Sequence, residues 1–567
     1  MPEHSMPEVE LSVVIPTYNR PDALRACVES LIGQDGQPPS LELIVVVDGP
    51  DPSTEAMLGS LLPPFPLRVV VQPHAGQAVA RNRGVEEARG CYVLFLDDDV
   101  VAESRLVGAH LEALRSGDRV VGVGRIDKVL SPRAPDWARS RQAVWRSHYD
   151  RLAGGRQPRF NDTYGGNLSV RRDLFMEVGG FATDIPVEHD VELGYRLAAA
   201  RARFVYVPDA IAREGDRDTL RHFLSDARRR GMVSVELYRR HPGLLPYLRL
   251  GGAGQLGRPW IALRMVLSAL RLSAYPLALL GSGLRLERLT GRWSGFLYTY
   301  CYWDGVRTAV DRDTWRRLQR GAAILMYHAI AGDGEQPGRY VLPLRSFERQ
   351  MQWLRRRGYN VIGLDELVAY LGEHRLLPPK TVVLTFDDGY RDNADLALPV
   401  LERFGFPATC FLVSGSGGRP SWDCVAELRS RPLLAPAEAG ELLDGLSLGA
   451  HSRTHPRLPG LELDEVEPEV AGSKADLETA LGRPVTTFAY PYGATSPEVR
   501  AAVAAAGFLA ACGITEGLNR HATDIYDLHR LEVRGTDSLL RFALTLWLAG
   551  RPSLTWPRLR RTRLDRQ

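Results

Sequence analysis

Short apolar runs typical of buried parallel strands occur in two separate parts of the chain, and this rhythm limits the fold more than any other feature. The first part contains four such runs: LSVVIPTY, LELIVVVDG, LRVVVQP and CYVLFLDDD. Segments with helical spacing lie between them, at residues 22–31 and 76–88. Strands and helices that alternate in this way build a parallel sheet with helices on its faces. The sequence therefore predicts an α/β domain over residues 1–215.

The alternation of apolar runs and helical segments stops at residue 216 and resumes near residue 321. The later runs, with helical segments between them, are AAILMYHAI, TVVLTFDDG, ATCFLVS, LSLGAHS, VTTFAYPYG and LAACGIT. They predict a second α/β domain over residues 321–550, built as a distorted β/α barrel. Residues 216–320 contain 19 Arg against 8 acidic residues and predict a basic helical connector. Residues 551–567, with 6 Arg and one Asp, predict a basic tail.

The six cysteines and the N-terminus favour a reducing compartment. The cysteines lie far apart without a CxxC pair, which excludes a disulfide scaffold and a cysteine-based zinc module. No basic region followed by an apolar region marks a secretory signal at the N-terminus. We therefore expect a cytoplasmic protein, either free or peripheral on the inner face of the membrane.

An apolar stretch at residues 259–284 is the strongest candidate for a membrane contact. Arg264 and Arg271 interrupt it and leave only about 13 residues free of charge at 272–284, fewer than the span of about 20 apolar residues that a bilayer requires. It either packs on a neighbouring domain or lies in the membrane surface as an amphipathic helix.

Carboxylates follow two of the apolar runs in the first domain. Asp48 ends one run, and Asp97, Asp98 and Asp99 end another. The carboxyl ends of strands in an open α/β sheet face the ligand crevice. Three adjacent aspartates repel one another unless a cation lies between them, and such a cation can hold a diphosphate. A plain acidic turn is the alternative interpretation, common for one aspartate and less common for three.

Several further motifs accompany these carboxylates in a fixed order. They are VVIPTYNRP, VVVDGP, GQAVARNRG, FLDDDVV, GGNLSVRRDLF, VGGFATDIPVEHDVELGYRL and FVYVPDA. Over about residues 10–215 the chain resembles the family-2 glycosyltransferases, which have the GT-A fold. The resemblance implies inverting transfer of a sugar from a nucleotide sugar, which we predict to be a UDP-sugar, to a carbohydrate or glycolipid acceptor. The QxxRW signature of processive synthases is absent, so we expect a single transfer.

The resemblance also implies roles for individual residues. Asp190 would take the proton from the acceptor hydroxyl, with Glu188 as the alternative base. Asp99 would bind Mg²⁺ or Mn²⁺ as part of a DxD pair with Asp97. The other contacts with the nucleotide sugar and the acceptor would come from Pro16, Tyr18, Arg20, Asp48, Arg81, Gly165, Gly166 and Asn167. The chain departs from the family where His189 replaces the usual Glu and where VVDG replaces VDDG.

The basic segment at residues 216–320 has two interpretations. It could continue the transferase as helices over the acceptor site, where Arg228–Arg230 and Arg239–Arg240 would suit a phosphate or an anionic lipid headgroup. Alternatively, these arginines lie on solvated helix faces of an arginine-rich protein. We do not expect nucleic acid as a partner, because the chain carries no recognition motif for it.

The second domain carries a different set of metal-binding side chains. Asp387 and Asp388 follow a predicted strand in TVVLTFDDGY, and His451 and His455 follow another in LSLGAHSRTH. On one turn of helix, residues four apart share a face, so both imidazoles would reach one ion. One aspartate and two histidines form an open site for Zn²⁺ or another divalent metal. A lone HxxxH is more often a pair of ordinary histidines, and a lone DDG is more often a turn.

The order of the motifs favours the metal site. TFDDG, HSRTH, FAYPYG and LHR follow one another, and over about residues 321–545 the chain resembles polysaccharide deacetylases of the NodB type, carbohydrate esterase family 4. The resemblance implies that Asp387 is the general base for the water that attacks an N-acetyl group. The Tyr492 backbone N–H would stabilise the oxyanion, and His529 would protonate the leaving amine. The implied metal ligands are Asp388, His451 and His455.

One position in this segment departs from the pattern. Many members of the family carry an arginine that orients the base, and Ala489 stands there in this chain. Asp387 must therefore be held by another group, and Arg530 is a candidate. His328 either lines the pocket or is a buried structural histidine.

Two domains that act on sugars in one chain suggest sequential chemistry. The first would add a sugar and the second would remove an acetyl group from that sugar or a related one, in the biosynthesis of a glycan, a glycolipid or a glycosylated metabolite. Two alternatives stay open. One domain has lost catalysis and serves as a carbohydrate-binding module, or the two activities serve separate substrates.

Overall fold

The computed structural model describes residues 9–35, 40–215, 219–252, 290–319, 321–420 and 425–549, together with residues 263, 264, 267 and 422. The chain forms two compact units, Met1–Leu237 with Leu272–Thr308 and Tyr238–Arg271 with Ala309–Gln567. Most of the apolar stretch 259–284 and all of the predicted tail 551–567 lie outside the described residues. None of the described helices is both long and apolar enough to cross a membrane.

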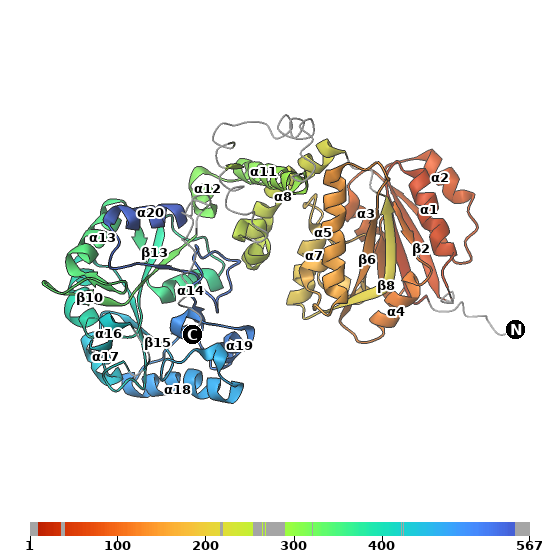
Figure 1. The fold of residues 1–567 in the computed structure, drawn as a ribbon. Coiled ribbons are helices and arrows are strands. Elements are labelled where there is room, and N and C mark those ends of the chain that lie inside the picture. The colour runs from red at the N-terminus through yellow and green to blue at the C-terminus, as the bar shows by residue number, and fades with distance from the viewer. Residues whose placement is uncertain are drawn as a thin grey trace. The chain divides into compact units, whose positions relative to one another are not determined.

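A mixed sheet forms the centre of the first unit. Its strands are β1 (Leu11–Thr17), β2 (Leu41–Asp48), β3 (Leu67–Gln72), β4 (Tyr92–Leu96), β5 (Val100–Ala102), β6 (Val120–Val129), β7 (Asn167–Arg171) and β8 (Arg203–Gly215). They lie in the order β3-β2-β1-β4-β7-β6-β8-β5. Figure 1 shows β2, β6 and β8 of this sheet among the helices of the first unit. The first four strands pair in parallel, as the sequence predicts, and β7 is antiparallel to both β4 and β6.

The prediction of a buried strand is wrong for β3. Val69 and Val71 are 41% and 43% exposed, although the run LRVVVQP is as apolar as its neighbours. The reason is that β3 lies at the edge of the sheet, where it has a partner strand on one side only.

Helices cover both faces of this sheet. Val13 and Ile15 of β1 point to one face and Val14 to the other, because successive side chains of a strand alternate. The first face packs against α1 (Pro21–Ile32), α2 (Pro52–Gly59), α4 (Leu106–Leu114) and α5 (Asp136–Ala153). The second packs against α3 (Gln77–Glu87), α6 (Arg172–Glu177) and α7 (His189–Ala199), and a short helix η1 (Phe160–Asp162) precedes β7. Helices α1 and α3 match the helical segments expected at 22–31 and 76–88.

Two long helices of the basic segment cross at very short range. They are α8 (Leu220–Arg240) and α11 (Thr290–Ala309). A Cβ atom on Gly231 would collide with the carbonyl oxygen of Tyr302, and one on Gly305 would collide with that of Arg228. Only glycine at these positions lets the two backbones approach so closely.

The second unit is built on a parallel sheet. Its strands are β9 (Ala323–Tyr327), β10 (Ala329–Ala331), β11 (Val341–Pro343), β12 (Asn360–Val361), β13 (Thr381–Phe386), β14 (Thr409–Leu412), β15 (Ser447–Ala450), β16 (Thr487–Ala489), β17 (Ala510–Cys512) and β18 (Arg530–Glu532). The main order is β17-β16-β15-β14-β13-β9-β18, with β12 beside β13 and a separate β10–β11 pair. A parallel bridge between Cys512 and Leu528 nearly closes the sheet. The expected distorted β/α barrel is therefore confirmed.

Helices surround this barrel and bury its apolar residues. They are α12 (Arg312–Leu318), α13 (Leu344–Arg356), α14 (Leu364–Gly372), α15 (Leu398–Phe404), α16 (Ala426–Arg429), α17 (Pro436–Leu442), α18 (Leu463–Leu481), α19 (Pro497–Ala505) and α20 (Leu539–Ala549). Shorter helices are η2 (Pro242–Tyr247), η3 (Arg249–Gly251), η4 (Asn393–Ala397), η5 (Leu458–Gly460) and η6 (Pro491–Gly493). Residues Asp387, His451 and Tyr490 directly follow β13, β15 and β16. Parallel strands end at one edge, so these three segments share that edge of the barrel.

Candidate functional sites

Asp48 ends β2 in the first unit, and the loop after β3 wraps around its carboxylate. The backbone N–H groups of Ala75 and Gly76 each donate to it at 2.8 Å, and the side chain of Gln72 donates at 2.7 Å. Burial alone would raise the pKa of Asp48, but these hydrogen bonds hold it below its ordinary value. The exposed ring of Tyr18 stacks on His74 with centroids 4.2 Å apart, and together they form an aromatic wall beside this carboxylate.

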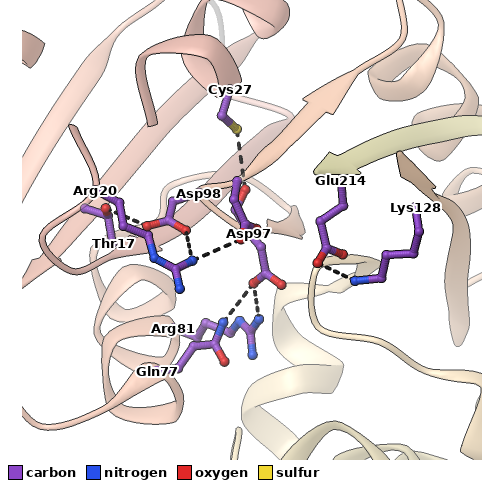
Figure 2. A network of polar contacts seen from close by, with 10 residues as sticks. Thr17, Arg20, Cys27, Gln77, Arg81, Asp97, Asp98, Lys128 and Glu214 are labelled. Atoms are coloured by element: carbon purple, nitrogen blue, oxygen red, sulfur yellow. Dashed lines mark hydrogen bonds and ion pairs between the residues drawn. The ribbon is translucent and has the colours of Figure 1, made fainter. Parts of the chain in front are cut away.

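Figure 2 shows the polar contacts of Asp97 and Asp98, two of the three aspartates that follow β4. Arg81 and Gln77 both donate to Oδ1 of Asp97, at 2.6 and 2.8 Å. Asp98 is buried and accepts a hydrogen bond of 2.8 Å from the hydroxyl of Thr17. Burial raises the pKa of Asp98 to about 6, although the hydrogen bond from Thr17 opposes the shift.

Asp99 is half-buried, and its carboxylate lies 3.0 Å from Nη1 of Arg20, which also reaches Asp98 at 3.3 Å. Burial and the charge of Asp97 raise the pKa of Asp99. Lys128, paired with Glu214, places a further positive charge near Asp99. No sequence motif marks Lys128 and Glu214, which lie in register on the paired strands β6 and β8.

The base expected from the sequence lies at the start of α7. Asp190 accepts backbone N–H groups of Val191 at 2.9 Å and Gly165 at 3.4 Å. Glu188, the alternative base, lies in an ion pair with Arg230, and burial raises its pKa.

His189 lies next to this base and contacts the arginine that holds Asp97. Its Nε2 atom is 2.8 Å from Nη1 of Arg81. A guanidinium only donates, so Nε2 of His189 accepts and the ring is neutral. Burial and the charge of Arg81 lower the pKa of His189 accordingly.

Residues 165–167 bring their backbone close to the aspartates, but the side chain of Asn167 points into the interior of the sheet. A Cβ on Gly166 would lie 2.5 Å from the Asp97 carboxylate, so a larger residue there would displace that carboxylate. Asn167 is buried and donates to the carbonyl groups of Arg125 and Ala210, both at 2.9 Å. Pro16 is likewise buried within β1. Their side chains therefore support the site from within the sheet.

In the second unit, one aspartate and two histidines converge at the edge of the barrel. The Nε2 atoms of His451 and His455 each lie 3.4 Å from Oδ1 of Asp388. The three ligand atoms are within 4.8 Å of one another, and all three side chains are buried. Burial would raise the pKa of Asp388, but the neighbouring imidazoles of His451 and His455 hold it well below its ordinary value.

The chemistry of these donor atoms fits a metal ion. Nδ1 of His451 is 2.8 Å from the carbonyl oxygen of Ala489, so Nδ1 carries the proton and Nε2 presents a lone pair. That lone pair faces the carboxylate of Asp388, which also only accepts. A cation or a proton between the two atoms would satisfy both.

The two histidines lie on a loop, so the expectation of a helical turn is wrong. Residues 451–455 contain no helix, and their conformation is left-handed at Ser452 and His455, with φ of 62° and 65°. Asp388 and Tyr492 are left-handed as well, with φ of 71° and 56°. Such conformations are unfavourable for residues with a side chain, and they concentrate at functional sites.

Arg530 contacts the candidate base of this site. Its Nη1 atom donates to Oδ1 of Asp387 at 2.6 Å, and its Nε atom donates to the carbonyl of Gly513 at 2.8 Å. Both charged side chains are buried. Burial would raise the pKa of Asp387, but the guanidinium and the neighbouring His451 hold it below its ordinary value.

Two aromatic rings contact His455 of this cluster. Trp422 stacks on His455 with centroids 4.4 Å apart, and Tyr492 packs against the same imidazole at 4.7 Å. Sequence reasoning missed Trp422, which no motif marks. His529 is half-buried, and burial lowers its pKa. His328 is also half-buried and packs against Tyr340 with ring centroids 4.7 Å apart.

Comparison with known proteins identifies the family of each domain. Residues 12–179 match the glycosyl transferase family 2 model, and residues 374–511 match the polysaccharide deacetylase model. The Bacillus subtilis protein YxkH, whose name marks it as a candidate polysaccharide deacetylase, is 29% identical over 226 residues, which make up 39% of this chain and 76% of that protein.

The relatives of the first domain are transferases. A glucosyl-dolichyl phosphate glucuronosyltransferase of Haloferax volcanii is 28% identical over 31% of this chain and 57% of its own length. A pre-mycofactocin glycosyltransferase of Mycobacterium tuberculosis is 28% identical over 49% of this chain and 57% of its own length. The chain thus spans just over half of each of these two relatives. It joins a glycosyl transferase family 2 domain at the N-terminus to a polysaccharide deacetylase domain at the C-terminus.

Proposed function

We propose that the chain is a bifunctional carbohydrate enzyme that transfers a sugar with one domain and removes an N-acetyl group with the other. The convergence of Asp388, His451 and His455 beside the buried Asp387–Arg530 pair carries the proposal most strongly. A pure binding module would have no use for a buried carboxylate held next to three metal-ligand atoms. We place the transferase in residues 1–215 and the deacetylase in residues 321–550.

In the transferase, Asp190 accepts the proton of the acceptor hydroxyl as its oxygen attacks the anomeric carbon. One displacement with a positioned base inverts that centre. Asp97 and Asp99 would hold Mg²⁺ or Mn²⁺, which supplies charge neutralisation for the diphosphate leaving group. Arg81 lies beside Asp97 and adds positive charge on the same side. The Tyr18–His74 wall and Asp48 would hold the base and ribose of the nucleotide.

In the deacetylase, Asp387 accepts a proton from the water that attacks the amide carbonyl. Arg530 orients the carboxylate and keeps it ionised, because the guanidinium lies 2.6 Å away in a buried setting. Asp388, His451 and His455 would hold Zn²⁺ or another divalent metal, which supplies Lewis-acid polarisation of the carbonyl and the water. The Tyr492 N–H stabilises the oxyanion, and His529 delivers a proton to the departing amine.

We propose that both reactions act on one product. A UDP-linked N-acetylhexosamine donates its sugar to a carbohydrate or glycolipid acceptor, and deacetylation then leaves a free amine. The presence of both domains in one chain supports this order of events. The arginine-rich segment 216–320 supports a peripheral contact between the enzyme and an anionic membrane that presents the acceptor.

Mass spectrometry of the products from a panel of nucleotide sugars tests the proposal. The expected product gains a hexosamine and then loses one acetyl group. Asp190→Asn should lower UDP release about 10²–10⁴-fold and leave deacetylation of a chito-oligosaccharide intact. Asp388→Asn should do the converse. Equal activities in both variants and the wild type would show that the site assignments are wrong.

A further inference from the structure

The loop that carries the two histidines of the deacetylase cannot hold its shape alone. Ser452 and His455 are both left-handed, although neither is glycine. Within the loop, the Ser452 hydroxyl accepts the N–H of His455 at 3.0 Å. Left-handed residues with side chains persist only where their surroundings fix them. The contacts that fix this loop therefore decide where the two Nε2 atoms lie.

One carboxylate of helix α18 caps the centre of the loop. Oε2 of Glu469 accepts the backbone N–H groups of Arg453 and Thr454, both at 2.9 Å. Its Oε1 accepts the hydroxyl of Thr454 at 2.6 Å. Three donors from two consecutive residues thus meet one side chain, midway between His451 and His455.

A second carboxylate on the same face of α18 holds the loop from the side. Asp476 binds the guanidinium of Arg453 through two hydrogen bonds of 2.8 Å and accepts the hydroxyl of Ser414 at 3.0 Å. Between the two carboxylates, a Cβ on Gly472 would lie 2.9 Å from the guanidinium carbon, so Arg453 lies flat on the helix backbone. Positions 469, 472 and 476 follow the i, i+3, i+7 spacing of one helix face.

We infer that Glu469 and Asp476 are positioning residues that set the metal affinity of the deacetylase site. They act through the loop and touch neither the metal nor the substrate. Glu469 determines the backbone path between the two histidines, and Asp476 prevents the loop from sliding along α18. This inference rests on the proposed metal-dependent function of the domain.

Glu469→Gln in the full-length chain tests the inference. Glutamine keeps one acceptor oxygen but replaces the other with an NH₂ donor, so it cannot accept the hydroxyl and the two backbone N–H groups at the same time. We expect the dissociation constant of Zn²⁺, measured by competition with a chromophoric chelator, to rise about 10- to 100-fold. In metal-free protein, the amide protons of Arg453 and Thr454 should exchange faster with solvent. The matched control is Glu467→Gln, an exposed glutamate on the same helix.

The outcomes separate this inference from the proposed function. If wild-type protein does not bind Zn²⁺ or any divalent metal, the proposed deacetylase function fails. If wild type binds and Glu469→Gln binds equally well, the positioning role is overturned. Deacetylation by Glu469→Gln should recover at saturating Zn²⁺, which a loss of folded protein would not allow. Asp476→Asn carries the same test if Glu469→Gln does not fold, and unchanged affinity there also overturns the inference.

Discussion

Each domain contains a buried arginine that contacts an aspartate at the end of a strand. Arg81 lies 2.6 Å from Asp97 in the transferase, and Arg530 lies 2.6 Å from Asp387 in the deacetylase. Both arginines are almost fully buried. The aspartates differ, because the side chain of Asp97 is 28% exposed and that of Asp387 is 4% exposed.

The difference in exposure suggests that the two arginine–aspartate pairs have different roles. Asp97 remains in contact with solvent, so a cation can compete with Arg81 for Asp97, or a phosphate can compete with Asp97 for Arg81. Asp387 has no such freedom, and its orientation is fixed by a partner that solvent cannot replace. A partly open pair suits a site that receives a charged ligand, whereas a closed pair suits a proton acceptor that must keep one direction.

Of the changes considered, removal of divalent metals should have the largest effect on the activities of the two sites. A chelator should reduce deacetylation to background, because Asp388, His451 and His455 alone cannot polarise the substrate. Zn²⁺ should restore deacetylation, and Mg²⁺ or Mn²⁺ should restore sugar transfer, since oxygen ligands favour these ions. Release of acetate and of UDP measures the two activities in the same sample. Recovery of both activities with Zn²⁺ alone would contradict the distinction between the sites.

Replacement of each arginine by methionine should reveal the cost of leaving its aspartate unpaired. Arg530→Met should lower the free energy of unfolding by about 3–5 kcal/mol, because Asp387 becomes a buried charge without a partner. Arg81→Met should lower the free energy of unfolding by less, about 1.5–3 kcal/mol, because solvent reaches the Asp97 carboxylate. Chemical denaturation of the full chain measures both.

Arg83→Met is the control for these two variants, because Arg83 forms a half-exposed pair with Glu87 on the same helix as Arg81. Arg83→Met should lower the free energy of unfolding by only about 0–1 kcal/mol. If Arg81→Met proved as costly as Arg530→Met, the exposure of Asp97 would not matter in the way we argue.

The aromatic ring on His455 should contribute the smallest effect. Trp422→Leu removes a stacking contact worth about 0.5–1.5 kcal/mol, so Zn²⁺ affinity should fall about two- to tenfold. Competition with a chelator measures the change, and UDP release by the other domain serves as the internal control. Unchanged affinity would mean that the stack does not help to hold His455.

Local patterns were sufficient to predict most of the architecture. Apolar runs that end in carboxylates indicated the edge of each sheet at which the functional side chains gather. Helices α1 and α3 lie where helical spacing placed them. The exposure of β3 could not be predicted, because it depends on the order of strands and not on their composition.

The contacts that depend on distant residues were harder to predict. Arg530 and Asp387 are 143 residues apart, and they meet because β18 and β13 both lie beside β9. The sequence made Arg530 a candidate only because it adjoins His529. The spacing of His451 and His455 matched a helix, whereas left-handed residues in a loop bring the two rings together. Residues that hold the loop from outside, such as Glu469 on α18, are not part of the HSRTH motif and could not be found from it.

The close crossing of α8 and α11 has a consequence for how this protein can diverge over evolution. Gly231 and Gly305 each face a carbonyl group of the opposite helix, so a methyl group at either position would clash with that carbonyl and push the two helices apart. A substitution at one position would have to wait until the two helices had separated, and separation removes the constraint on the other. We therefore expect these two glycines to be retained together or lost together among the descendants of this sequence.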